Sequence, residues 1–77
     1  MTSAAAIGSV YAAGQSEQDA AQRVVDTYVD QRANEDLSPA FDDIVFGESQ
    51  TTGIDDDTLY AYARELLLAQ TGELIED

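Results

Sequence analysis

Two runs of adjacent carboxylates are the residues whose chemistry could be catalytic. They are Asp42-Asp43 and Asp55-Asp56-Asp57. Paired carboxylates can act as general acid and base, but they need a deep cleft, which a few short helices hardly supply. The chain contains no histidine, lysine or cysteine, so the commonest bases and covalent nucleophiles are missing. We therefore predict no enzymatic activity.

The second chemistry open to these carboxylates is metal binding. Asp55, Asp56 and Asp57, with Glu48 nearby in the chain, offer the oxygen ligands that hard cations prefer. They lack the spacing of a calcium-binding loop, and consecutive residues at a helix start are expected to point in different directions. We interpret both carboxylate runs as groups that stabilise helix N-termini. We predict neither a metal site nor a cofactor.

Net charge limits the partners. Sixteen acidic residues face three arginines, which gives a formal net charge of −13. Binding to nucleic-acid phosphates needs a basic surface, and anionic membranes repel an acidic one. The sequence therefore predicts protein partners, in a homo-oligomer or a multi-chain assembly, with no direct nucleic-acid or membrane binding.

The same composition suggests an environment. Many acids with no lysine resemble the proteomes of extremely halophilic archaea and their viruses, and molar salt screens the repulsion between carboxylates. A bacterium of high GC content would also avoid lysine, but it would usually keep more arginine. The chain shows no recognisable secretory signal and no transmembrane stretch. We expect it in a virion or in the cytoplasm of a halophilic host.

The elements that carry these residues are expected to be helices. Apolar spacing predicts helices over 17–33 and 56–71, and Ser38-Pro39 followed by Gly47 predicts a short helix over 39–46. Ser16 and Asp55 are the expected N-caps, Gly72 the expected end of the last helix, and 48–53 a polar loop. The predicted fold is all-α: a small helical hairpin, closed by the third short helix, with an N-terminal arm. The expected core is Val24, Val25, Tyr28, Val29, Phe41, Ile44, Leu59, Ala63, Leu66 and Leu67.

The N-terminal arm, 1–15, precedes a small acidic helical domain, 16–77. Residues 1–16 carry no charge, which in so acidic a chain suggests a surface covered by a partner. Leu68 falls off the apolar stripe of the last helix, and two more apolar residues follow that helix. The predicted partner-binding residues are Ile7, Val10, Tyr11, Leu68, Leu74 and Ile75.

Three classes of function fit these observations. We favour a non-catalytic structural or assembly subunit of a larger complex, a small virion protein of the capsid or head-tail kind, adapted to high salt. The first alternative is an acidic mimic of nucleic acid that inhibits a DNA-processing protein. The second is a stand-alone regulatory domain of a halophile.

Overall fold

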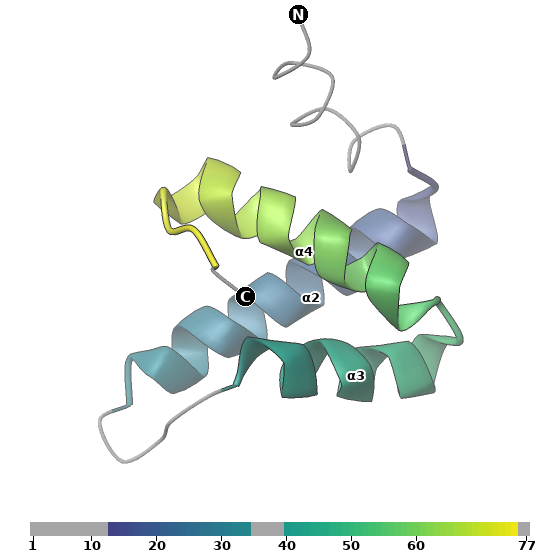
Figure 1. Ribbon diagram of the computed structural model, residues 1–77, viewed down its shortest axis with the longest axis horizontal. Coiled ribbons are helices and arrows are strands. Elements are labelled where there is room, and N and C mark those ends of the chain that lie inside the picture. The colour runs from purple at the N-terminus through teal and green to yellow at the C-terminus, as the bar shows by residue number, and fades with distance from the viewer. Residues whose placement is uncertain (1–12, 35–39, 76–77) are drawn as a thin grey trace, which may run out of the picture.

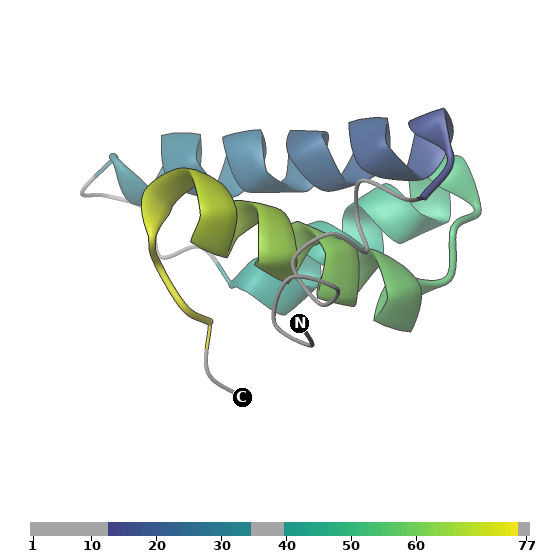
Figure 2. The ribbon, with the colours of Figure 1, turned by 90° about the horizontal axis from the view of Figure 1, so that it is seen from above.

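In the computed structural model, three helices pack against one another, and the part of the chain that the structure describes, residues 13–34 and 40–75, contains no strand. They are α2 (Gln15–Arg32), α3 (Phe41–Thr52) and α4 (Asp56–Thr71). In Figure 1, α2 lies behind the other two helices, and Figure 2 shows it as a layer that covers both. The predicted all-α fold is confirmed. No helix within the described ranges is long and apolar enough to cross a membrane.

The start of α2 differs from the prediction. The helix begins at Gln15, with Gly14 as N-cap in an extended conformation and without a side-chain capping bond. Ser16, the predicted N-cap, therefore lies inside the first turn. Two hydrogen bonds from Gln18 accompany this earlier start. The Gln18 backbone N–H donates to the Gly14 carbonyl, and the Gln18 side-chain amide donates to the Ala13 carbonyl.

The bounds of α3 differ more from the predicted range, 39–46, than those of α2 differ from theirs. The helix runs through Gly47 and covers 48–52, which were predicted to be loop, and it ends at Gly53 in the left-handed conformation (φ 78°). A glycine ends a helix by adopting that conformation, and Gly47 does not adopt it. Continuation buries Ser49 one turn beyond Val45, and the Ser49 hydroxyl donates to the Ile54 carbonyl at 2.6 Å. At the other end, the predicted Ser38-Pro39 start lies outside the described residues, and Ala40 is the N-cap.

The last helix forms as predicted. The Asp55 carboxylate accepts a hydrogen bond from the Thr58 backbone N–H at 3.1 Å, which caps the N-terminus of α4. At the other end Gly72 is left-handed (φ 77°), and its N–H donates to the Leu68 carbonyl. Both signals are local to the sequence, so tertiary packing was not needed to place them.

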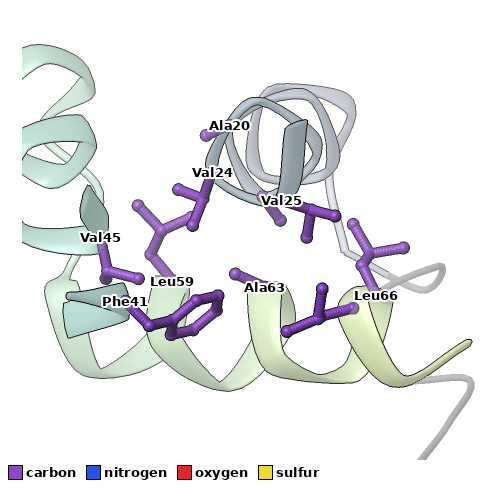
Figure 3. Packing of buried hydrophobic residues seen from close by; sticks show 10 residues of the cluster. Ala20, Val24, Val25, Phe41, Val45, Leu59, Ala63 and Leu66 are labelled. Atoms are coloured by element: carbon purple, nitrogen blue, oxygen red, sulfur yellow. The ribbon is translucent and has the colours of Figure 1, made fainter. Parts of the chain in front are cut away.

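The core lies where the three helices meet (Figure 3). Seven of its ten members were predicted. Tyr28, Val29 and Ile44 are only partly buried and flank the core rather than fill it. The inner face of α3 follows Phe41, Val45 and Ser49 instead, at spacings of four residues. The buried apolar residues are Ala20, Ala21, Val24, Val25, Phe41, Val45, Leu59, Ala63, Leu66 and Leu67.

Candidate protein-binding surface

Three large apolar side chains are exposed on the described part of the molecule. Leu68 on α4 is 38% exposed and Leu74, just after α4, is 59% exposed. Both were predicted to bind a partner. The third, Phe46 on α3, is 55% exposed and was not predicted, because its exposure depends on the path of α3 beyond Gly47. Singly exposed apolar residues are common, so the surroundings of each decide its meaning.

The other predicted partner-binding residues divide into two groups. Ile75 is partly buried and packs against the chain's own core. Ile7, Val10 and Tyr11 lie outside the described residues, so their role stays a prediction. Gln15, assigned to the arm, belongs to α2.

Leu74 stands beside a groove of about 510 Å³ that was not foreseen from the sequence. Its wall carries one aromatic ring from each helix: Tyr28 from α2, Phe41 from α3 and Tyr60 from α4. The Phe41 ring meets the other two edge to face, at centroid distances of 5.3 Å to Tyr28 and 5.4 Å to Tyr60. Such pairs add about 0.5–1.5 kcal/mol beyond simple burial. The three rings therefore hold one another in place.

Carboxylates and the segment after α4 complete this groove. Asp42, in the first turn of α3, and Glu73 line it together with Leu74 and Ile75. None of its lining residues within the described ranges is basic. The groove thus combines aromatic and aliphatic surface with two negative charges.

Glu73 also ties the end of the chain to α2. Its two carboxylate oxygens bind separately: Oε1 pairs with the Arg32 guanidinium, and Oε2 accepts a hydrogen bond from the Tyr28 hydroxyl at 3.2 Å. The guanidinium of Arg32 also lies over the Tyr28 ring, 5.4 Å from its centroid. These contacts hold Glu73 against α2, and Ile75, two residues further along, is partly buried against the core.

The acidic run at the start of α4 is more compact than expected. One carboxylate oxygen from each of Asp55, Asp56 and Asp57 lies within 4.8 Å of the others, although the side chains were expected to diverge. All three are exposed, and Asp55 is engaged by the backbone N–H and the hydroxyl of Thr58. Proximity of exposed acids at a helix start does not by itself define a cation site.

A second depression, of about 390 Å³, lies beside Phe46. It is bordered by the turn between α3 and α4, including Gly53 and Ile54, and by the start of α4 at Asp55. Ser49, which lines this depression, already donates its hydroxyl proton to the Ile54 carbonyl, so this proton is not available to a ligand.

Comparison with known proteins gives no indication of what this surface binds. No protein-family model, no curated protein and no solved structure matches the chain. The strongest feature of the described surface is accordingly the aromatic groove with the exposed Leu74 at its edge.

Proposed function

We propose that this chain is a non-catalytic assembly subunit of a larger protein complex, and specifically a small virion protein of the capsid or head-tail kind, adapted to high salt. The observation that carries the proposal is the 59% exposure of Leu74 beside a groove with aromatic walls. Covering apolar side chains contributes about 25 cal/mol per Å² buried, and interface energy concentrates on apolar and aromatic anchors next to pockets.

The small size of the domain supports a role inside an assembly. Seventy-seven residues without cysteine form a small core with no disulfide to support it. Burial of Leu68, Leu74 and Phe46 against another protein would add stability that the isolated chain lacks.

The charge distribution supports adaptation to salt. Three arginines can neutralise at most three of the sixteen carboxylates. Exposed acids occur on every helix, for example Asp26 on α2, Asp43 on α3 and Asp56 on α4. Screening at molar salt reduces the Debye length to about 3 Å and removes most of their mutual repulsion. The same spread over all helices is unlike the one-sided array that a nucleic-acid mimic needs, and that function is an outcome of the test below.

The test uses the chain as bait in a native extract or particle preparation at molar KCl. Wild type is compared with Leu74→Ser and Leu68→Ser, and the matched control is Ala69→Ser, an exposed position on the same helix as Leu68. We expect a defined protein partner, retained by wild type and by the control and reduced at least about fivefold by Leu74→Ser, as for an interface anchor worth about 1 kcal/mol.

Equal recovery with all baits would contradict the proposal. Recovery of a DNA-processing enzyme that duplex DNA displaces would replace the proposed function with that of the mimic. Detection of the chain within purified particles tests the virion assignment separately, and its absence from particles would leave a cellular assembly.

A further inference from the structure

The aromatic groove combines the two features that recognise a guanidinium group. The rings of Tyr28 and Tyr60 provide aromatic surface, and the carboxylate of Asp42 provides a planar acceptor. The two oxygens of Glu73 are already engaged, one by Arg32 and the other by the Tyr28 hydroxyl. Cations are attracted to aromatic faces, and arginine both stacks on rings and donates paired hydrogen bonds to carboxylates. Each of these groups therefore favours the same kind of side chain.

The chain already uses this chemistry internally. Arg32 lies over the Tyr28 ring and pairs with Glu73, whereas Arg64 lies over the Tyr60 ring with its guanidinium carbon 5.9 Å from the centroid. Both tyrosines of the groove thus hold an arginine of their own chain. Asp42 is exposed, lines the groove and forms no ion pair with the described residues.

We propose that the groove binds an arginine side chain presented by a basic segment of a partner protein. Charge complementarity favours this occupant, because Asp42 lines the groove without an ion pair among the described residues and the chain has a net charge of −13, whereas Glu73 is already paired with Arg32. A second copy is a poorer source of this arginine, because the chain has three arginines and two of them already lie over Tyr28 and Tyr60. Leu74 and Ile75 would contact an apolar residue next to the arginine, so the favoured ligand alternates arginine with leucine. This inference rests on the proposed function, since it names the class of partner.

The direct test is a titration of the full chain in 1 M KCl, followed by the NMR signals of the tyrosine and phenylalanine rings. The probe is the blocked peptide acetyl-Leu-Arg-Leu-Arg-Leu-amide, and its control carries citrulline in place of arginine. Molar salt suppresses general attraction to a polyanion and leaves contacts at close range. We expect saturable shifts at Tyr28 and Tyr60 with the arginine peptide and at least threefold weaker binding of the citrulline peptide.

Two matched pairs of variants assign the binding to the groove. Asp42→Asn and Asp43→Asn remove the same charge from adjacent exposed positions in the first turn of α3, but only Asp42 lines the groove. Asp42→Asn should weaken peptide binding about threefold, within the range of partly exposed ion pairs, and Asp43→Asn should leave it unchanged. Tyr60→Leu should weaken it about threefold through loss of the ring, whereas Tyr62→Leu, outside the groove on the same helix, should not.

Three results would overturn the inference: no saturable binding, equal binding of the citrulline peptide, or equal effects of Asp42→Asn and Asp43→Asn. The outcome is separable from that of the assembly proposal. If Leu74→Ser abolishes capture of a partner while the arginine peptide fails to bind, the assembly role stands and the groove assignment is wrong. If the peptide binds as expected while no partner is captured, the groove assignment stands and the assembly role is wrong.

Discussion

Arg32, the last residue of α2, forms an ion pair with Glu73, which follows α4 by two positions. The pair joins residues forty-one positions apart and fixes the path of the chain along one side of the aromatic groove. Both side chains are about a third exposed, 39% for Arg32 and 32% for Glu73, so solvent and salt weaken their attraction.

We predict a small but measurable coupling between these two residues. In a double-mutant cycle with Arg32→Gln and Glu73→Gln, urea unfolding should give a coupling free energy of about 0.5 kcal/mol at the lowest KCl concentration at which the chain stays folded, and less at molar KCl. The coupling should be small because solvent reaches both side chains, which are 39% and 32% exposed. Coupling that stays at the same value as salt rises would show that the contact is not a screened ion pair.

The core assignment predicts opposite outcomes for two leucines on one helix. Leu66 is 3% exposed and Leu68 is 38% exposed. Leu66→Ala should lower the free energy of unfolding by about 2–5 kcal/mol, the usual range for a buried leucine truncated to alanine. Leu68→Ala, which removes the same atoms from the surface, should cost less than about 1 kcal/mol. Thermal unfolding of the two variants in molar KCl is the measurement, and similar losses would refute the packing of α4.

The glycines of α3 provide a test of its corrected end. Gly47 lies inside the helix, and a methyl group added there meets no atom within 4 Å. Gly47→Ala should therefore stabilise the protein by about 0.5–1 kcal/mol. Gly53→Ala should destabilise it by about 1–2 kcal/mol, because the left-handed conformation is unfavourable for alanine. If Gly47→Ala destabilised the protein, α3 would end near Gly47 as the sequence first suggested.

These glycines also show why the sequence located some elements and not others. Asp55 and Gly72 mark the ends of α4 through local interactions, and that helix was predicted residue for residue. Gly47 and Gly53 are equivalent as local signals. The choice between them depends on burial of Val45 and Ser49 against the other helices, which no local pattern contains.

One part of the candidate site could likewise be predicted from the sequence, and the other part could not. The exposure of Leu68 and Leu74 was predictable, because each lies off the apolar stripe or beyond the helix end. The groove was not predictable, since Tyr28, Phe41 and Tyr60 come from three helices whose crossing brings the rings together. Helical periodicity had assigned Tyr28 and Phe41 to the core and gave no reason to group either with Tyr60.

Salt dependence of folding tests the proposed adaptation. On transfer from molar to tenth-molar KCl, the Debye length grows from about 3 to about 10 Å, and the carboxylates repel one another more strongly. We expect the far-ultraviolet circular dichroism signal of the isolated chain to show loss of helix over this range and to recover when salt is restored. A helical signal that stays constant down to low salt would contradict adaptation to brine and leave the fold assignment intact.

The central claim, that the chain works inside a larger assembly, is tested most directly by its native size. The measurement is the elution position of the chain, detected with an antibody, when a native extract is fractionated by size in molar KCl. We predict elution with a complex several times larger than the 8.3 kDa chain, shifted to smaller size when Leu74→Ser replaces the wild type in the host. Elution of all the wild-type chain as an 8.3 kDa monomer would contradict the account.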